Sequence, residues 1–326
     1  MELQSVKKIL AARNDRFGEL LLIIPALRAL KEKFPQATIT LTVDPYCGEL
    51  AQCMEFVDES LAWENRRHSF FEILSFVRKI RKERFDLCVV FNPSKEFNII
   101  SFLARIPLRI GYDRKAAALL THVMTDTKHL GEKHEIAYNL DLVGLVGAHT
   151  ENKGLSLRIN SDIINALNKE LGIEKRNDLV ALHPWTSDPV KQWPLDNFRE
   201  LAVRLVDECK LTVLVVGGTQ EAAKSRHYFD KAGGRLVNLT GRTSLTQLAA
   251  LLAECRFLIS GDSGPVHLAA SAGRPVLALF RNDMPGKSPL RWGPQSAGSI
   301  VIEKPRLSDI SVEEVVAKVR QMMGKL

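Results

Sequence analysis

The sequence lacks the features that mark membrane-spanning, secreted and metal-binding chains. No apolar run reaches the ~18 residues needed to cross a bilayer. The opening residues, MELQSVKKILAARND, lack the apolar stretch and the small-residue cleavage site of a signal peptide. The five cysteines are scattered and never in CxxC spacing, which argues against a zinc site or a disulfide framework. We therefore expect a cytoplasmic protein whose cysteines are small core or loop residues.

Several common ligand-binding signatures are also absent. There is no GxxxxGK[ST] phosphate loop, no HExxH, no GxSxG and no EF-hand pattern, and no GxGxxG follows the first expected strand. These absences weaken assignments as a P-loop enzyme, a zinc protease or a dinucleotide dehydrogenase. No long basic block, RNP-like run or zinc-finger spacing predicts a nucleic-acid partner. The net charge of +7 fits either ordinary surface lysine and arginine or an anionic acceptor near a membrane.

The chain does contain a repeated alternation of apolar strands and amphipathic helices. Its 326 residues favour two domains, and 45% hydrophobic with 25% charged residues is typical of a soluble globular protein. Strand and helix patterns alternate in the first half at 7–12, 20–34, 38–43, 70–82, 86–91, 105–111 and 135–146. They alternate in the second half at 178–182, 195–208, 211–216, 221–232, 236–239, 244–253, 257–260, 265–272, 274–279 and 312–323.

This rhythm predicts an α/β fold of parallel βαβ units. We expect two Rossmann-like domains with doubly wound parallel sheets facing a cleft. Their predicted bounds are 1–155 and 156–326, and the linker falls within the more polar segment 147–178.

The sharpest local motif is SGDSGPVH at 260–267, which follows an expected strand and opens an expected helix. Glycine lets a ligand approach the backbone, and a helix N-terminus offers unpaired N–H groups to an anion. The motif thus predicts a pyrophosphate site at Asp262, Ser263 and Gly264, with His267 as a phosphate or sugar ligand. The alternative is a plain capped turn, with Asp262 or Ser263 as N-cap and His267 as a half-buried polar residue.

A second motif, HPWTSDPVKQWP at 183–194, also lies between a strand and a helix. The hydroxyls of Thr186 and Ser187 and the ammonium of Lys191 suit a diphosphate. They are placed at the carboxyl end of a strand, where open α/β sheets bind ligands. The alternative is a loop in which Trp193 and the following proline only hold the next helix.

Two weaker features follow in the second half. In GGTQE at 217–221 the glycines admit a ligand close to the backbone, and the carboxylate of Glu221 fits a ribose diol. Thr243 precedes a helix and fits an N-cap near a bound base. For the GGTQE motif, a plain turn is at least as good an interpretation.

The first half has its own candidate, the loop RNDRFGE at 13–19, which crowds two carboxylates and two guanidiniums into one turn. Acidic residues favour the first turn of a helix, so capping is one interpretation of Asp15 and Glu19. The other is a general base that removes a proton from an acceptor hydroxyl while a nucleotide leaves.

Taken together, these motifs resemble glycosyltransferase family 9, the ADP-heptose:lipopolysaccharide heptosyltransferases. The resemblance covers nearly the whole chain. It is carried by residues 13–37, RIGYDR at 109–114, the motifs at 183–194 and 217–221, and most specifically GRTSLTQLAALLAECRFLISGDSGPVHLAASAGRPVLALF at 241–280.

The resemblance implies a GT-B fold, an inverting mechanism without a metal, ADP-L-glycero-D-manno-heptose as donor and the inner core of lipopolysaccharide as acceptor. No cofactor beyond this ADP-sugar co-substrate is expected. The implied donor contacts are Thr186, Ser187 and Lys191 to the phosphates and sugar, Glu221 to the ribose, Thr243 at the adenine, and Asp262, Ser263, Gly264 and His267 at the donor-binding turn. The DxD pair of metal-dependent glycosyltransferases is absent.

One departure from the family pattern affects the base. Family members carry Gly-Asp in the first loop, where this chain has Gly18 and Glu19. The added methylene shifts the reacting carboxylate, and a ~1 Å misplacement costs about 100-fold in rate. Glu19 is our preferred base and Asp15 the second candidate.

The expected acceptor is an anionic, lipid-linked glycan, reached by peripheral contact with the inner membrane surface. The alternatives are transfer of another nucleotide-activated sugar, a nucleotide-sugar 2-epimerase on the same fold, and a binding protein without activity.

Overall fold

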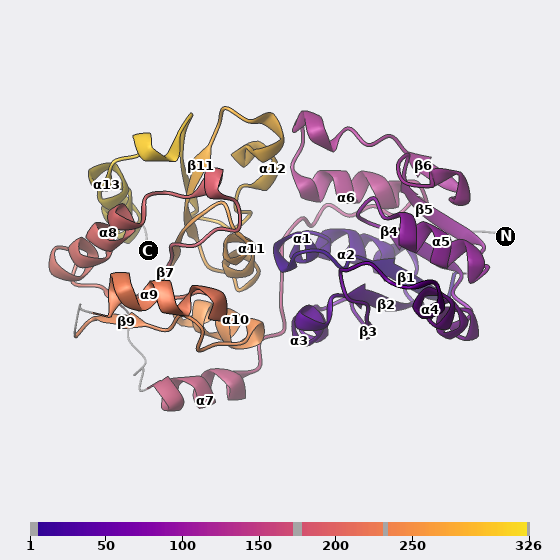
Figure 1. Ribbon diagram of the computed structural model, residues 1–326, viewed down its shortest axis with the longest axis horizontal. Coiled ribbons are helices and arrows are strands. Elements are labelled where there is room, and N and C mark those ends of the chain that lie inside the picture. Colours follow the sequence, from indigo (N-terminus) through magenta and orange to yellow (C-terminus); the bar gives the residue numbers. More distant parts are fainter. Residues whose placement is uncertain (1–5, 172–177, 231–233, 325–326) are drawn as a thin grey trace. The chain divides into compact units, whose positions relative to one another are not determined.

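The computed structural model describes residues 6–171, 178–230 and 234–324 (Figure 1). The chain divides into two compact units, Met1–Gly154 and Leu155–Leu326. Each unit contains one six-stranded sheet in which every neighbouring pair of strands is parallel. The strand orders are β3-β2-β1-β4-β5-β6 and β12-β11-β10-β7-β8-β9. The α/β class with two doubly wound parallel sheets, predicted from the sequence, is confirmed.

The first unit alternates short buried strands with helices. Its strands are β1 Lys8–Ala12, β2 Thr38–Val43, β3 Glu59–Ala62, β4 Leu87–Val90, β5 Leu108–Tyr112 and β6 His122–Met124. Its α-helices are α1 Phe17–Leu21, α2 Ile24–Lys33, α3 Gly48–Gln52, α4 Phe70–Glu83, α5 Lys95–Leu103 and α6 Glu135–Gly144. β1 and β4 are almost wholly buried, as expected for central strands covered on both faces.

The second unit repeats the plan. Its strands are β7 Leu179–His183, β8 Thr212–Val215, β9 Leu236–Asn238, β10 Leu258–Gly261, β11 Val276–Arg281 and β12 Ile300–Lys304. Its α-helices are α7 Ser161–Leu171, α8 Leu195–Asp207, α9 Ala222–Phe229, α10 Leu245–Glu254, α11 Gly264–Ser271, α12 Pro289–Trp292 and α13 Val312–Met323. Apolar side chains from α8, α13 and the central strands form one continuous core.

Each sheet has one point where the strand order reverses. The chain leaves β1 toward β2 and leaves β4 toward β5 on the opposite side, so the reversal in the first unit lies between β1 and β4. In the second unit it lies between β7 and β10. Open α/β sheets bind ligands just beyond the carboxyl ends of the strands at such a point. The loops that follow these four strands are therefore the first places to look for a site.

The helix predicted at 20–34 is wrong in its start and its continuity. Helix α1 already begins at Phe17, so Glu19 lies in its first turn rather than in the preceding loop. The helix then breaks after Leu21, and α2 begins at Ile24 with Pro25 in its first turn. Proline has no N–H and its ring clashes with the carbonyl four residues earlier, so one continuous helix through Leu21 is excluded.

All five cysteines are free thiols. Cys47, Cys88 and Cys255 are buried, and burial raises the pKa of each thiol to about 12. Cys53 and Cys209 are partly exposed. Since the thiolate is the reactive form, the three buried thiols are poor nucleophiles at neutral pH.

Candidate functional site

In the second unit, two loops meet beyond the reversal point of the sheet. β7 is followed by residues 184–194, which contain a short 3₁₀ turn at Pro189–Lys191. β10 is followed directly by Asp262 and Ser263, and α11 then begins at Gly264. Ser260 is paired with His183 across the two strands, so both loops start from the same level of the sheet. The structure thus brings together the two strongest motifs of the sequence.

An ion pair joins these two loops. The ammonium of Lys191 contacts the carboxylate of Asp262, and the two side chains are 17% and 10% exposed. Burial raises the pKa of Asp262, while the charge of Lys191 opposes that rise. An ammonium has three N–H donors, so Lys191 retains donors for a further oxygen ligand. The pair therefore places an ammonium with further N–H donors next to the start of α11, with its charge balanced by Asp262.

Beneath the pair, three polar side chains fix the turn at 260–263. His183 Nδ1 lies 3.1 Å from Ser260 Oγ and 3.2 Å from Ser263 Oγ, and the two hydroxyl oxygens are 2.8 Å apart. Burial lowers the pKa of His183 to about 3, so the imidazole is neutral at physiological pH. This triangle gives the turn a defined shape without adding charge to it.

The predicted capping role at this turn needs a correction. Ser263 is the N-cap residue of α11 by position, but its hydroxyl makes no capping hydrogen bond. It is used by the triangle with Ser260 and His183 instead. Pro265 cannot donate, so the first N–H groups available at this helix end are those of Ser263 and Gly264. His267 is 4% exposed, which makes it buried rather than half-buried.

The GGTQE segment approaches the same edge of the sheet from β8. A Cβ at Gly217 would lie 2.5 Å from the indole of Trp185, whose Nε1 donates to Val216 O at 3.1 Å. A Cβ at Gly218 would lie 2.9 Å from Glu221 Oε2. Glycine at 217 is thus required by the protein's own packing, whereas at 218 the flexible end of Glu221 can move aside. Glu221 ends the 3₁₀ turn Thr219–Glu221 and is partly exposed.

Thr243 is not the N-cap that the sequence suggested. The N-cap of α10 is Ser244, whose hydroxyl accepts a hydrogen bond from Gln247 N–H. In turn, the side-chain oxygen of Gln247 accepts a hydrogen bond from Ser244 N–H. Thr243 precedes this capping box and is partly exposed. Two residues before Thr243, Gly241 has a φ of +79°, which favours glycine.

In the first unit, the loop after β1 separates the two candidate bases. Asp15 Oδ1 accepts a hydrogen bond from Arg13 Nε at 2.8 Å, and Arg13 is 3% exposed. Glu19 is partly buried in the first turn of α1, and burial, followed by the negative charge of Asp15, raises its pKa. Asp15 is therefore held as the partner of a buried cation, whereas burial raises the pKa of the Glu19 carboxyl above its ordinary value.

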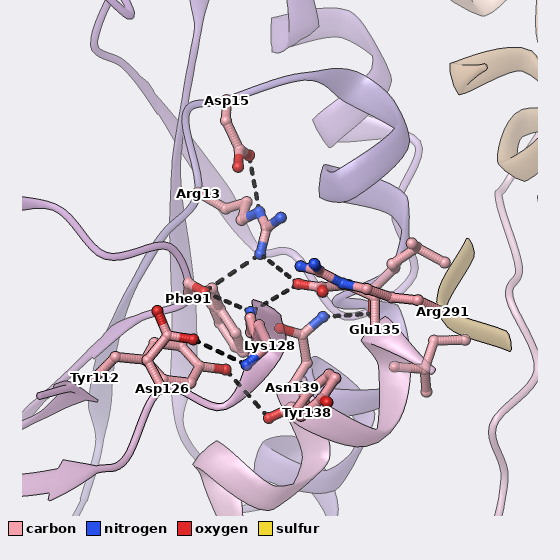
Figure 2. Close-up of polar contacts among 12 residues, drawn as sticks. Arg13, Asp15, Phe91, Tyr112, Asp126, Lys128, Glu135, Tyr138, Asn139 and Arg291 are labelled. Atoms are coloured by element: carbon pink, nitrogen blue, oxygen red, sulfur yellow. Dashed lines mark hydrogen bonds and ion pairs between the residues drawn. The ribbon is translucent and has the colours of Figure 1, made fainter. Parts of the chain in front are cut away.

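Arg13 belongs to a buried charge network, shown in Figure 2. Its guanidinium lies 3.5 Å from Glu135 Oε1 and donates to Phe91 O at 3.3 Å, just beyond β4. Lys128 Nζ contacts the same Glu135 oxygen at 2.7 Å and lies 4.5 Å from the centre of the Tyr112 ring. Glu135 is 1% exposed. The network ties the loop after β1 to the loop after β4 and to the start of α6.

Two further hydrogen bonds fix α1, the helix that carries Glu19. The Tyr46 hydroxyl accepts from Phe17 N–H at 3.0 Å at the beginning of the helix. Asn139 Nδ2 donates to Leu22 O at 3.1 Å, and this carbonyl lies in the break before α2. Both ends of a five-residue helix are thus anchored to other elements. A helix this short needs such anchors, because isolated short helices are not stable in water.

A comparison with known protein families decides the assignment of the chain. Residues 73–317 match the model described as Glycosyltransferase family 9 (heptosyltransferase). The chain belongs to glycosyltransferase family 9. The resemblance stated from the sequence motifs is thereby confirmed, and the protein is a glycosyltransferase rather than an isomerase.

Individual relatives agree with this assignment. Lipopolysaccharide heptosyltransferase 2 of Salmonella typhimurium is 26% identical over 298 residues, which span 86% of this chain and 85% of the relative. The structure of a family 9 glycosyl transferase from Veillonella parvula has a TM-score of 0.86 and 21% identity, covering 100% of this chain and 99% of that one. The E. coli ADP-heptose lps heptosyltransferase II structure has a TM-score of 0.85 and 22% identity, covering 98% and 99%. These two structures share the fold of this chain.

The sequence missed three charged residues of this family 9 glycosyltransferase. Nothing in the sequence around Glu135 and Lys128 indicated a site. These residues lie far from Arg13 in sequence and come close to it only in the folded protein. Lys287 Nζ contacts Asp188 Oδ2 at 2.7 Å, which places a second ammonium beside the loop that carries Lys191. The carboxylate of Asp188 lies close to Lys191 in the sequence, in a loop rich in hydroxyls. This carboxylate was the only feature of the sequence that indicated a further cation.

Proposed function

We propose that this family 9 glycosyltransferase transfers heptose from ADP-L-glycero-D-manno-heptose to an inner-core acceptor of lipopolysaccharide. Two relatives support this choice, since one is a lipopolysaccharide heptosyltransferase and the other an ADP-heptose lps heptosyltransferase. The observation that carries the proposal is the ion pair between Lys191 and Asp262 at the reversal point of the second sheet. A partly buried ammonium next to a helix N-terminus suits a diphosphate.

The donor would be bound by the second unit. Lys191, with the hydroxyls of Thr186 and Ser187, would contact the diphosphate and the sugar, and the N–H groups of Ser263 and Gly264 would add to the positive end of α11. Asp262 would accept from heptose hydroxyls. The three remaining candidates would line the nucleotide end and the far side of the turn: Glu221, Thr243 and His267.

The reaction would proceed with inversion. Glu19 takes the proton of the acceptor hydroxyl, whose oxygen attacks the anomeric carbon from the face opposite ADP. The bond from the anomeric carbon to the diphosphate breaks, and its electron pair leaves with ADP. Lys191 and the N-terminus of α11 stabilise the negative charge that develops on the diphosphate. In this scheme protein groups take the role that a metal ion plays in other transferases, so chelators should leave the rate unchanged.

Acceptor binding would belong to the first unit. A cavity of about 370 Å³ lies there between Trp63 and α4, and Arg66, His68 and Lys79 are among its lining residues. Trp63 Nε1 donates to Glu96 Oε2 at 2.9 Å, and His68 Nδ1 lies 3.1 Å from Glu96 Oε1, so this wall has a fixed shape. Arg66 in this lining is paired with Glu64 and Glu72, so Lys79 is the cationic group that would meet an anionic glycan.

The test is donor turnover with a matched set of variants. Purified protein is incubated with ADP-heptose and core-truncated lipopolysaccharide, with and without EDTA. Released ADP is measured, and the anomeric configuration of the product is read by NMR. Loss of a charge-stabilising donor costs about 100- to 1,000-fold in kcat, so we expect losses of this order for Lys191→Ala. Asp262→Ala should also be impaired, and Lys224→Ala on the exposed face of α9 is the control.

The outcomes separate the alternatives. If Lys191→Ala and Asp262→Ala both keep full activity, the site assignment is wrong. If ADP-heptose fails to raise the thermal stability while a GDP- or UDP-sugar does so, the donor is another nucleotide sugar. Tight ADP-heptose binding with no turnover on any acceptor would indicate a binding protein that has lost its base.

A further inference from the structure

The outward face of α4 combines exposed aromatic and cationic side chains. Phe70 and Phe71 at the start of the helix are 70% and 79% exposed, the two highest values among the large apolar residues that the structure describes. The inward face is ordinary core, formed by Phe76, Val77 and Ile80. Figure 1 shows α4 in the first unit, on one face of its sheet. Neither phenylalanine is needed to fill that core.

The same segment holds most of the excess positive charge of the chain. Residues 66–84 contain seven arginine and lysine residues against two glutamates, a net charge of +5 within a chain of net +7. Glu72 is paired with Arg66, and Glu83 is paired with Lys8 from outside the segment. Arg78 and Lys82 are exposed, and no ion pair in the described part of the chain includes them. The charge on this face is thus not compensated locally.

The spacing of these residues places them on one stripe of the helix. Phe71, Arg78 and Lys82 are separated by seven and four residues, which is close to whole turns of an α-helix. Phe70 lies one residue before Phe71, about 100° around the helix, and borders the apolar end of this stripe. A Ser69–Glu72 capping box holds the first turn, so the phenylalanines are presented on a fixed backbone. The stripe therefore has an apolar end and a cationic end, and both can contact the same partner surface.

We propose that this stripe docks on the surface of a lipid bilayer that carries anionic headgroups. Phe70 and Phe71 would enter the boundary between headgroups and acyl chains, while Arg78 and Lys82 contact the headgroups. A protein partner fits less well, because lysine is depleted at protein interfaces and the net charge of +5 in residues 66–84 favours an extended anionic surface. Within the described residues, no helix is both long and apolar enough to cross a membrane, so the contact proposed is with the surface.

This surface is independent of the transfer reaction, because binding to lipid requires neither donor nor acceptor. The measurement is co-sedimentation of the full chain with vesicles of phosphatidylcholine alone or of phosphatidylcholine with about 30% phosphatidylglycerol. We expect binding to the anionic vesicles only, and weaker binding in 0.5 M NaCl, because salt screens the cationic contacts.

Two double variants test the two ends of the stripe. Phe70→Ser with Phe71→Ser should weaken binding to anionic vesicles on the order of tenfold or more, since the apolar insertion is lost. Arg78→Glu with Lys82→Glu should weaken it at least about 25-fold, at roughly fivefold per cation. All four side chains are exposed, so the thermal stability of both variants should equal that of the parent. Val203→Ser on α8, and Lys224→Glu with Arg226→Glu on α9, serve as matched controls.

Three results would overturn the proposal. One is an absence of binding to anionic vesicles by the unmodified chain. Another is binding by both α4 variants within twofold of the parent. The third is a loss in the control variants equal to that in the α4 variants, which would make the attraction a property of net charge alone. If the chain fails to bind vesicles but a protein cross-links to this stripe, the surface belongs to a protein partner.

Discussion

Glu19 and Asp15 lie four residues apart, but only Asp15 is bonded to a buried guanidinium. A general base contributes about 100- to 10,000-fold. We therefore expect Glu19→Gln to lower kcat by at least about 100-fold, and Asp15→Asn by tenfold or less. Steady-state kinetics measures kcat for both variants, and the affinity for the donor should stay unchanged. A larger loss for Asp15→Asn than for Glu19→Gln would transfer the base role to Asp15.

The pH dependence offers a separate test of the same assignment. A base acts when ionised, and burial together with Asp15 raises the pKa of Glu19. The acidic limb of the kcat/KM profile should therefore lie above the ordinary glutamate pKa. Asp15→Asn removes a negative charge that raises this pKa, so the limb should move to lower pH. A limb that stays in place in Asp15→Asn would show that it does not report Glu19.

His183 makes the stability of the second unit depend on pH. Its folded-state pKa is about 3, below the ordinary 6.5, because the ring is buried. As the pH falls below 6.5, His183 binds a proton in the unfolded chain but not in the folded chain. The free energy of unfolding therefore decreases on acidification. From pH 6.5 to 4.5 this is about 2 kcal/mol. Urea unfolding should show a flatter dependence for His183→Asn, while exposed His122→Asn behaves as the parent.

At the scale of elements, the turn after β8 depends on close packing. A methyl group at Gly217 would meet the Trp185 indole at 2.5 Å. We expect Gly217→Ala to lower the free energy of unfolding by about 1–3 kcal/mol, the usual cost of overpacking. Chemical denaturation measures it. Gly48→Ala is the control, because nothing lies within 4 Å of its Cβ position and it begins a helix. Equal stability of the two variants would contradict the packing argument.

The elements that the sequence predicted are those with a strong apolar period. Strands such as β2 and helices such as α13 were placed with their observed bounds, because their patterns are local. β3, β6 and β12 were missed, since they are edge strands of their sheets and only partly buried. Helix α7 was absorbed into the predicted linker because its surroundings are polar. The bound predicted at Ala232 lies outside the described residues.

The candidate site was predictable to the extent that it is contiguous in sequence. The motifs at 183–194 and 260–267 each carry their own strand, turn and helix signals, and the structure brings Lys191 and Asp262 together. The network around Arg13 was not predictable, because Glu135 contacts it from more than a hundred residues away. The N-cap of α10 was predicted one residue too early, at Thr243 instead of Ser244.

At the scale of the whole molecule, the two units should respond differently to the donor. If the proposed donor site is correct, ADP-heptose stabilises the unit Leu155–Leu326 by mass action. At a concentration of 100 times Kd this amounts to about 2.7 kcal/mol. Hydrogen exchange should show the added protection in β7, β10 and α11. Protection confined to Met1–Gly154 would place the nucleotide in the other unit.

The distribution of thiols gives the molecule a pair of built-in labelling positions. Cys53 in one unit and Cys209 in the other are partly exposed, whereas the remaining three are buried with pKa values raised to about 12. Burial also raises the pKa of Cys53, so its labelling should be the slower of the two. A maleimide dye should therefore attach to two of the five cysteines of the native chain. A donor and acceptor fluorophore at these positions would report the separation of the units by energy transfer. Domain motion during turnover could thus be followed in the unmutated enzyme.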